Sequence, residues 1–434
     1  MSSSAVIETS PLVPEAHARR IVDPRSYGQH ALLHESFSWL RKHQPLGKVV
    51  LDDYAPFWLV TKHADIQEIS RQNDKFHNGD LSTILIAKGV DENIRRMTGG
   101  SPHMVRNLVN MDPPEHMKYR MLTQSWFSPN SVRRYEEKLR GIARGFVDRM
   151  VAGGERCDFV RDVALHYPLH VLMEILGVPE KDEPLMLKLT QELFGARDPD
   201  MGRSAAEMED PAKAVKVLQQ VLADFGNYFN GITEARRREP RDDVATVIAN
   251  ATIDGAPIKP FEAASYYVIL ATAGHDTTSA STAGAIWELC NNPEQLAKVQ
   301  ADPSLIAGLV DEAIRWTTPV KHFMRSAVVD YELRGSSIKA GDWLMLSYYS
   351  GNFDEEVYPD PYSFRVDRTS NRHLAFGFGA HACLGQHMAK LEMRVLLEEL
   401  LPRIASLELD GTPKTGQSPL VSGPKTLPIR CRFK

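Results

Sequence analysis

The sequence predicts a mainly α-helical protein with a minor β region, and three observations support that fold class. Apolar residues recur at helical spacing over most of the 434-residue chain. Short β-type segments stand near both ends, at residues 49–51 and 57–61 and again between 324 and 349. No repeat or low-complexity linker divides the chain. Because the early and late strands would have to pair, we expect residues 1–434 to form a single domain.

Three helices matter most for function. The first should open at residues 112–115, where Asp, Pro and Glu occupy the N-cap, first-helical and capping-box positions. The second should run from about residue 260 to 291, which makes it about twice as long as a usual helix and suits a central helix that crosses the domain. The third should begin just after Cys383 and end at Pro402, with one buried apolar stripe.

Composition narrows the class of protein. A net charge of −5 offers no basic surface for nucleic acid or for an anionic membrane. The first dozen residues are small and polar and contain no apolar core, which argues against a secretory signal or a membrane anchor. We therefore expect a cytoplasmic protein with no nucleic-acid or membrane partner. Residues 1–20 are expected to be disordered or loosely packed.

The four cysteines are Cys157, Cys290, Cys383 and Cys431, and they form no CxxC pair. This wide spacing argues against a disulfide framework. The CxxCH motif of a covalently attached haem is absent from the sequence. Three of these cysteines carry no signal beyond a small side chain that is easily buried. Cys383 differs because of the loop in which it stands.

The cysteine loop comprises residues 376–385, with the sequence FGFGAHACLG. Its glycines would allow tight turns and a close approach to a flat ligand. Cys383 would lie at the start of a helix, where free backbone N–H groups favour a thiolate. Judged from composition alone, a glycine-rich turn with a buried structural cysteine is an equal alternative. A zinc site is a further alternative, formed by the neighbouring His373, His381, Cys383 and His387, but it lacks the paired-ligand spacing of structural zinc.

The middle of the second helix carries Gly-His-Asp-Thr at residues 274–277 within a strongly apolar segment. Glycine inside a helix costs roughly 1 kcal/mol relative to alanine. A carboxylate at that depth needs a partner or a purpose. Such local violations tend to occur at functional sites. The alternative is structural, with a threonine hydroxyl bonded back to its own helix at a kink.

Phe376, Gly379, Cys383 and Gly385 together match the pattern FxxGxxxCxG. The loop resembles the cysteine-loop signature of the cytochrome P450 family. This resemblance implies the cytochrome P450 fold, with the long central helix over a haem and the cysteine-loop helix on the other side. It also implies haem b (iron protoporphyrin IX) as the cofactor and Cys383 as the axial ligand of its iron, donating electron density that favours cleavage of the O–O bond.

Further residues match the family's pattern. The resemblance implies that Phe376 packs near the sulfur and that His381 reaches a haem propionate. His116 and Arg120 match the DPPxHxxxR helix of bacterial members, and being four apart they share a helix face. Arg325 matches another propionate partner. Taken singly, each of these residues would be an ordinary surface charge.

Glu312 and Arg315 resemble the family's ExxR helix, and their distance ahead of Cys383 supports that match. Arg368 would complete a Glu–Arg–Arg network, for which the resemblance implies a structural role.

Asp276 and Thr277 resemble the acid–alcohol pair, in which the threonine hydrogen-bonds at the oxygen site and the aspartate relays solvent protons to it. The reaction implied is R–H + O₂ + two electrons + two protons giving R–OH and water. A ferredoxin with a separate reductase is the expected electron donor, docking near Arg120 and Lys390.

The resemblance extends from Trp39 to Lys425 and includes segments similar to the bacterial alpha-terpineol hydroxylase subfamily, such as residues 182–191 and 371–376. A monoterpenoid-like substrate is therefore favoured. Aromatic hydrocarbons, larger terpenoids and sterols are alternatives within the same class, and a non-catalytic haem sensor is an alternative from another. The intact Asp-Thr pair argues against the sensor. The expected substrate pocket consists of small or apolar residues, namely Ile269, Ala273, Val320 and Phe323.

Overall fold

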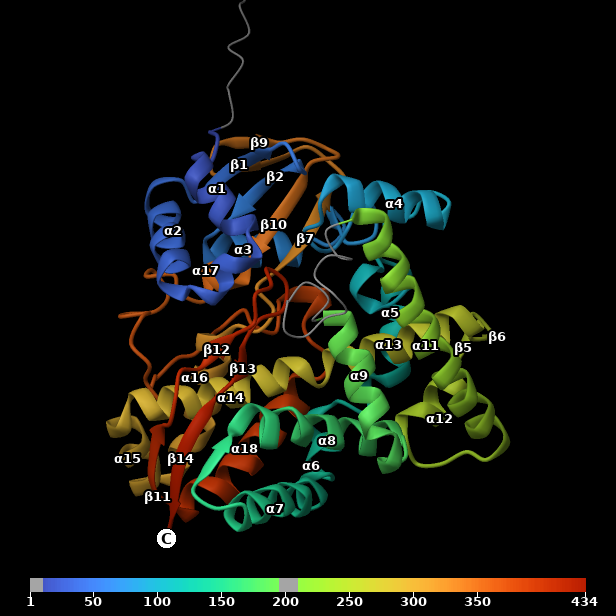
Figure 1. Ribbon diagram of the computed structural model, residues 1–434. Coiled ribbons are helices and arrows are strands. Elements are labelled where there is room, and N and C mark those ends of the chain that lie inside the picture. Colours follow the sequence, from blue (N-terminus) through green and yellow to red (C-terminus); the bar gives the residue numbers. More distant parts are fainter. Residues whose placement is uncertain (1–10, 195–209) are drawn as a thin grey trace, which may run out of the picture.

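The computed structural model describes residues 11–194 and 210–434. Its main sheet joins both ends of the chain, as the sequence predicted, and Figure 1 shows the blue and orange strands side by side. The strand order is β1-β2-β10-β7-β3, with β10 parallel to β2 and antiparallel to β7. These strands are β1 (Leu46–Leu51), β2 (Tyr54–Val60), β3 (Phe76–His77), β7 (His322–Ala327) and β10 (Trp343–Ser347).

The smaller sheets of the described residues are one three-stranded sheet and three two-stranded hairpins. The three-stranded sheet β11-β14-β4 again pairs late strands with an early one. The hairpins are β5–β6, β8–β9 and β12–β13. The strands are β4 (Arg156–Asp158), β5 (Thr252–Ile253), β6 (Ala256–Pro257), β8 (Tyr331–Leu333), β9 (Ser336–Ile338), β11 (Ile404–Leu409), β12 (Lys414–Thr415), β13 (Pro424–Thr426) and β14 (Pro428–Phe433).

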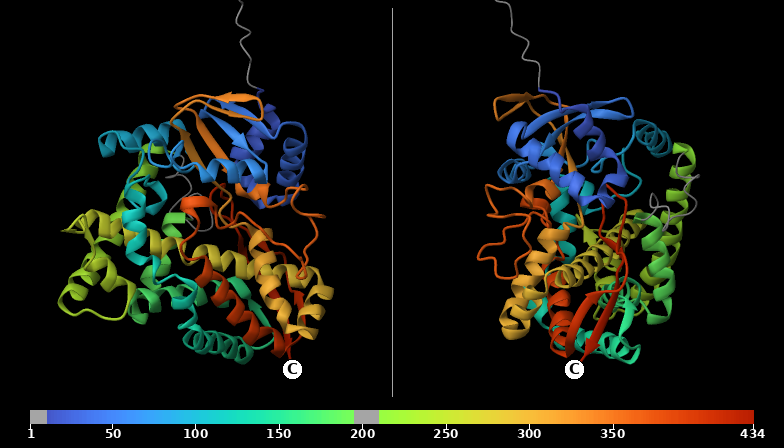
Figure 2. Two further views of the ribbon diagram at one scale, coloured as in Figure 1. Left: turned by 180° about the vertical axis from the view of Figure 1, so that it is seen from behind. Right: turned by 60° about the vertical axis from the view of Figure 1, so that its left-hand side comes forward.

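Most helices lie below the main sheet in Figure 1 and in both views of Figure 2, while the blue helices of the N-terminal part lie beside it. The fold is mainly α with a minor β region, as predicted. The α-helices are α1 (Glu15–Val22), α2 (His30–His43), α3 (His63–Arg71), α4 (Lys88–Thr98), α5 (Glu115–Gln124), α6 (Pro129–Arg133), α7 (Glu136–Ala152), α8 (His166–Leu176), α9 (Glu183–Phe194), α11 (Pro211–Arg238), α12 (Val244–Ala249), α13 (Pro260–Ala273), α14 (Asp276–Asn291), α15 (Pro293–Ala301), α16 (Ile306–Thr317), α17 (Tyr348–Gly351) and α18 (Gln386–Leu400).

Short helical turns connect these elements. One π-helical turn, η3 (Val160–Ala164), leads directly into α8. The 3₁₀ turns are η1 (Pro24–Gly28), η2 (Leu108–Asn110), η4 (Glu180–Asp182), η5 (Pro303–Leu305), η6 (Gly379–His381) and η7 (Leu401–Arg403). Within the two described ranges, no helix is both long and apolar enough to cross a membrane.

The central helix is divided, which corrects the single run expected from residue 260 to 291. It consists of α13 and α14, with Gly274 and His275 between them. A Cβ at Gly274 would lie 3.0 Å from the carbonyl oxygen of Leu270 and 3.1 Å from Leu172 of α8, so a side chain there would require its neighbours to move by a few tenths of an ångström. At the break, the hydroxyl of Thr277 donates to the carbonyl of Ala273 at 2.9 Å. The helix therefore breaks at the segment whose sequence violates helix design.

The cysteine-loop helix agrees with its prediction. α18 begins at Gln386, three residues after Cys383, and η7 follows it up to Arg403. One face of α18 packs into the main hydrophobic core because its apolar residues recur at helical spacing. The buried apolar residues of this helix are Met388, Leu391, Met393, Val395, Leu396, Leu397 and Leu400.

The Glu–Arg–Arg network forms as predicted. Glu312 and Arg315 on α16 are both 0% exposed, and two guanidinium nitrogens of Arg315 reach the carboxylate at 2.7 and 2.8 Å. Arg368 donates to the same carboxylate at 2.9 Å. Arg315 also donates to the carbonyls of Asn352 and Pro361. A buried charge is tolerated only when it is paired and hydrogen-bonded, so the network fixes residues 352–371 and, through them, the approach to the cysteine loop.

Two expectations about local structure were wrong. Residues 1–10 lie outside the described residues, but 15–20 are neither disordered nor loosely packed, since α1 buries Ala18 and Ile21. Asp112 is not an N-cap, because α5 begins at Glu115 and the Asp112 carboxylate accepts hydrogen bonds from the backbone N–H groups of Asn78 and Gly79. The carboxylate ties the loop after β3 to the start of α5.

Lys321 provides a stability prediction. Its side chain is 1% exposed and donates to the carbonyl of Thr317 at 2.7 Å, with the Tyr349 ring beneath it. Burial lowers the pKa of Lys321 from 10.5 to about 7. Below pH 7 the amine is charged in both states, so burying it costs on the order of 5 kcal/mol, and this cost shrinks as the pH rises towards 10.5.

Lys321→Met should therefore raise the free energy of unfolding by more at pH 6 than at pH 9. Urea unfolding followed by circular dichroism at the two pH values measures the difference. An equal change at both would contradict the buried, titrating amine.

Candidate active site

The cysteine loop lies between the end of α3 and the start of α18. Gly377 and Gly379 have φ of +68° and +73°, the left-handed region that favours glycine. A Cβ at Gly379 would lie 2.1 Å from the carbonyl oxygen of Ser70, so α3 packs directly on the loop. The predicted tight turns are thus present before Cys383. At Gly385 an added Cβ meets nothing within 4 Å and φ is −86°, so no contact within the protein requires that glycine.

The thiol of Cys383 is accessible although protein surrounds it. The side chain is exposed, yet burial in the surrounding protein raises its pKa, so Cys383 faces an internal space and not the outer surface. The backbone N–H groups of Gly385 and Gln386 donate to the sulfur, and they and Arg120 oppose the rise in pKa. The Cys383 N–H donates to the carbonyl of Phe376 at 2.8 Å. These N–H groups are the thiolate support expected at a helix start.

Four groups that can carry positive charge gather near Cys383. His116 and His381 stack with ring centroids 4.1 Å apart. Arg120 donates to the carbonyl of Ala382 at 2.8 Å, and Arg325 hydrogen-bonds Tyr348. Burial, and then Arg120, lowers the pKa of His116 to about 4. Burial and the neighbouring cations lower the pKa of His381 as well.

These groups have no acidic partner in the described part of the chain. The partners of Arg120 and Arg325 there are the carbonyls of Ala382 and Met324 and the side chain of Tyr348, none of them a carboxylate, and neither ring nitrogen of His116 has a hydrogen-bond partner. The Nε2 atom of His381 is likewise buried and unpartnered. Unpartnered buried polar atoms call for a ligand or a functional explanation. A cysteine sulfur beside two imidazoles and two guanidiniums fits an iron porphyrin with two carboxylates, and it does not fit tetrahedral zinc.

The predicted acid–alcohol pair stands at the break of the central helix. The Thr277 hydroxyl donates to the carbonyl of Ala273, which is the contact expected if this threonine had only a structural role. Ala273 is nevertheless exposed, and the Thr277 hydroxyl is accessible. The side chain of Asp276 is 14% exposed, and burial raises its pKa. Its Oδ2 is buried without a hydrogen-bond partner among the described residues. The next residue, Thr278, donates to Glu392 of α18 at 3.2 Å, which joins this helix to the cysteine-loop helix.

The expected substrate-pocket residues are placed on two segments. Ile269 and Ala273 lie one turn apart on α13, with Ile269 half-buried and Ala273 exposed. Val320 is half-buried and its backbone bridges to Val421 of the β12–β13 connection. Phe323, half-buried on β7, packs edge-on against Tyr348 at 6.2 Å.

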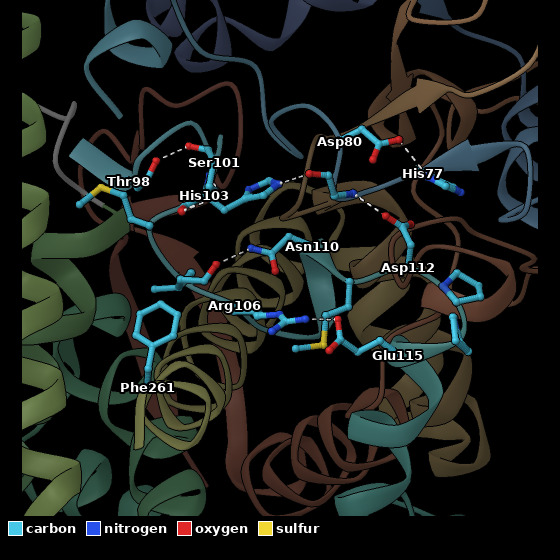
Figure 3. A pocket seen from close by; sticks show the side chains of 16 residues that line it. His77, Asp80, Thr98, Ser101, His103, Arg106, Asn110, Asp112, Glu115 and Phe261 are labelled. Carbon is cyan, nitrogen blue, oxygen red and sulfur yellow. Dashed lines mark hydrogen bonds and ion pairs between the residues drawn. The ribbon is translucent and has the colours of Figure 1, made fainter. Parts of the chain in front are cut away.

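A separate open pocket of about 800 Å³ lies between the segment after α4 and the starts of α5 and α13 (Figure 3). None of the predicted site residues lines it. Its polar groups bond to one another, since Arg106 pairs with Glu115 and His77 contacts Asp80 at 2.9 Å. Arg106 also reaches Glu262 of α13 at 3.3 Å. The contacts of Arg106 hold residues 101–107 against α5 and α13. This pocket is therefore not part of the site around Cys383.

Sequence reasoning missed several residues of the site. The Gly-His-Asp-Thr run gives His275 no role of its own, yet it contacts both Asp276 and the carbonyl of Leu165. Tyr348 contacts Arg325, and Glu392 contacts Thr278. A glutamate inside the apolar stripe of α18 was a usable signal, because buried carboxylates are rare without a partner. No signal in the sequence links Leu165 to His275.

The family's sequence model, described as Cytochrome P450, matches residues 77–425. The chain is 49% identical over 418 residues to cytochrome P450-terp of a Pseudomonas species, covering 96% of this chain and 98% of that protein. It is 32% identical to a steroid C26-monooxygenase of Mycolicibacterium smegmatis over 85% of this chain and 82% of that protein.

Solved structures agree with this assignment. The crystal structure of CYP108D1 from Novosphingobium aromaticivorans matches with a TM-score of 0.90 and 48% identity, over 98% of this chain and 100% of that one. The structure of CYP268A2 from Mycobacterium marinum in complex with pseudoionone matches with a TM-score of 0.84 and 29% identity, over 99% of this chain and 100% of that one. The chain belongs to the cytochrome P450 family and is a haem-containing monooxygenase that is close to P450-terp.

Proposed function

We propose that this enzyme hydroxylates a C–H bond of a small apolar substrate, with a monoterpenoid favoured, using haem b bound through Cys383. The observation that carries the proposal is the accessible Cys383 sulfur, supported by two backbone N–H groups and accompanied by two guanidiniums and two imidazoles without acidic partners in the described part of the chain. When bound, a thiolate-ligated haem activates dioxygen, so that one oxygen atom enters the C–H bond and the other leaves as water with two electrons and two protons.

The chain's own residues orient the cofactor and deliver protons. His116, Arg120, Arg325 and His381 are the proposed partners of the two haem carboxylates, and Phe376 is the proposed neighbour of the sulfur. Such charge-assisted hydrogen bonds are about twice as strong as neutral ones. Thr277 is proposed to hold a proton at its hydroxyl oxygen. Asp276 is proposed to supply that proton, because a carboxyl group whose pKa is raised by burial is a suitable general acid near neutral pH.

The substrate proposal rests on similarity and on the chemistry of the proposed pocket. The 49% identity to cytochrome P450-terp over nearly the whole chain favours a monoterpenoid such as alpha-terpineol. Ile269, Val320 and Phe323 are apolar and Ala273 is small, which suits a substrate held by shape with few polar contacts. Aromatic hydrocarbons and larger terpenoids or sterols are the competing substrate classes. The 32% identity to a steroid C26-monooxygenase supports sterols as one of these alternatives.

An absorbance titration of the ferric enzyme tests this proposal. We expect alpha-terpineol to shift the Soret band from low spin to high spin, because a bound substrate excludes water from the iron. Pseudoionone, an aromatic hydrocarbon and a sterol serve as competing probes at matched concentrations. A shift with the sterol alone would replace the substrate class. An intact Soret band that shifts with none of the four would contradict the small apolar substrate while leaving the family assignment in place.

A ferredoxin with a separate reductase, working in the cytoplasm, is the proposed electron donor. The two expected docking residues are already engaged, since Arg120 donates to Ala382 and Lys390 pairs with Asp311 at 2.7 Å. Exposed cations elsewhere around the cysteine loop suit an acidic partner better. They are Arg71, whose guanidinium lies 4.8 Å from the ring centroid of Phe378 in the loop, and Arg372, four residues before the loop in sequence, and no acid of the described ranges pairs with either.

A further inference from the structure

His275 fills the break between α13 and α14, directly before the proposed acid Asp276. Its side chain is 0% exposed, so it is as deeply buried as any group in the core. The ring reaches from the central helix to Leu165, which joins the π-helical turn η3 to α8. The family resemblance gave this residue no role, and the proton delivery proposed above does not use it.

The contacts of the imidazole determine which nitrogen carries hydrogen. Nε2 lies 3.0 Å from the carbonyl oxygen of Leu165. A carbonyl oxygen can only accept, so Nε2 is the N–H nitrogen. Nδ1 then faces Asp276, with its nitrogen 3.2 Å from Oδ1 of the carboxyl group. The contact is close, but it is not aligned as a hydrogen bond in this conformation.

One proton between these two groups resolves an otherwise costly arrangement. A neutral Nδ1 and an ionised carboxylate both carry lone pairs, and at 3.2 Å in a buried site they repel each other. A proton on either atom converts the contact into an attraction. It also leaves the pair with no net charge, which burial strongly favours over a lone carboxylate. The Oδ2 atom of Asp276 has no partner in the described part of the chain, so it is available to turn towards Thr277 or water.

We propose that His275 is a positioning residue that binds the Asp276 carboxyl group and retains one proton on the His275–Asp276 pair. The proposal rests on the proposed role of Asp276 as the acid. In each delivery one proton leaves the pair through Asp276 towards the Thr277 hydroxyl, and one proton from solvent restores it. Because Nε2–H is committed to Leu165, the ring holds the carboxyl group but does not conduct protons to solvent.

The electrostatic surroundings of Asp276 are simple. Burial raises the pKa of Asp276, and among the described residues His275 is the titratable group that opposes this rise. Glu392, on α18, contacts Thr278 and not Asp276, and burial keeps its own pKa high. The lowering effect of His275 comes from the form in which Nδ1 carries the shared proton and stabilises the carboxylate, so loss of the imidazole should raise the pKa of the Asp276 carboxyl group further.

An infrared pH titration of the ferric, substrate-free holoenzyme measures this effect without turnover. The Asp276 carboxyl band is identified by its loss in Asp276→Asn. In His275→Phe we expect that band to titrate at higher pH and to report weaker hydrogen bonding than in the unmutated enzyme. We also expect product per electron to fall by about tenfold, less than the roughly 10²–10⁴-fold loss of a general acid itself because Asp276 is retained, with the difference appearing as peroxide. Substrate-induced spin shift and reduction by the donor should be retained.

Two further variants separate positioning from packing. His275→Gln places its amide near Nε2, so it keeps the donor to Leu165 and should behave like His275→Phe. His275→Asn places its amide near Nδ1 and should recover part of the yield. Thr272→Val is the matched control, because the Thr272 hydroxyl is buried in the same central helix and donates only to backbone carbonyls within it.

The outcomes distinguish this inference from the proposed function. Unchanged carboxyl titration and unchanged yield in His275→Phe, alongside a low yield in Asp276→Asn, would overturn the role of His275 alone. A normal yield in Asp276→Asn would overturn both.

Discussion

Replacing Cys383 with serine is expected to abolish both the thiolate signature and hydroxylation. The serine hydroxyl stays protonated under conditions in which the two backbone N–H groups and Arg120 support a thiolate. The electron donation that assists dioxygen cleavage would then be lost. The absorbance spectrum of the reduced enzyme with carbon monoxide measures the ligand directly. Turnover of alpha-terpineol measures the consequence.

Cys431→Ser provides the matched control. Cys431 is a buried thiol in β14, paired with β11 and β4 and remote from the cysteine loop in sequence and sheet. It should keep the thiolate signature. A thiolate spectrum retained in Cys383→Ser, or lost only in Cys431→Ser, would refute the assignment of Cys383 as the iron ligand.

Thr277→Ala is expected to uncouple electron consumption from product formation. The hydroxyl bonds back to Ala273 and remains accessible, so its removal leaves the helix backbone intact and takes away the proposed proton carrier. Loss of a positioned proton donor typically costs about 10²–10⁴-fold in rate. Electrons should still be consumed, with peroxide replacing the hydroxylated product. Product and peroxide per electron, measured in the same assay, give the partition.

Thr282→Val tests whether any buried threonine of α14 has this effect. The Thr282 hydroxyl is fully buried and has no hydrogen-bond partner in the described part of the chain. We expect this variant to stay coupled. Unchanged product per electron in Thr277→Ala would show that protons reach the site by another route.

The sequence predicted features that depend on local pattern. The apolar stripe of α18 and the strands around Val49 and Phe57 follow from spacing alone, and the structure places them as expected. The three-residue spacing of Glu312 and Arg315 does not by itself indicate a buried ion pair. The pair is informative only because of its position in the sequence ahead of Cys383. Residues that act through a motif could therefore be found before the structure.

Features that depend on contacts between distant segments could not be predicted. Leu172 of α8 packs against the break at Gly274, and no pattern around residue 274 encodes that neighbour. Asp112 has the composition of an N-cap, but backbone N–H groups 33 and 34 residues earlier take both of its oxygens. The partner of His275 lies 110 residues earlier. In each case tertiary contact overrides a local preference.

Turnover of alpha-terpineol under isotopically labelled dioxygen tests the central claim most directly. The account predicts a hydroxylated product that carries one labelled oxygen atom, with the second labelled atom in water. Product whose new oxygen atom comes from the solvent would contradict a monooxygenase acting on this class of substrate. The same conclusion would follow if alpha-terpineol shifted the Soret band but the enzyme, when reduced by a ferredoxin, gave no oxygenated product.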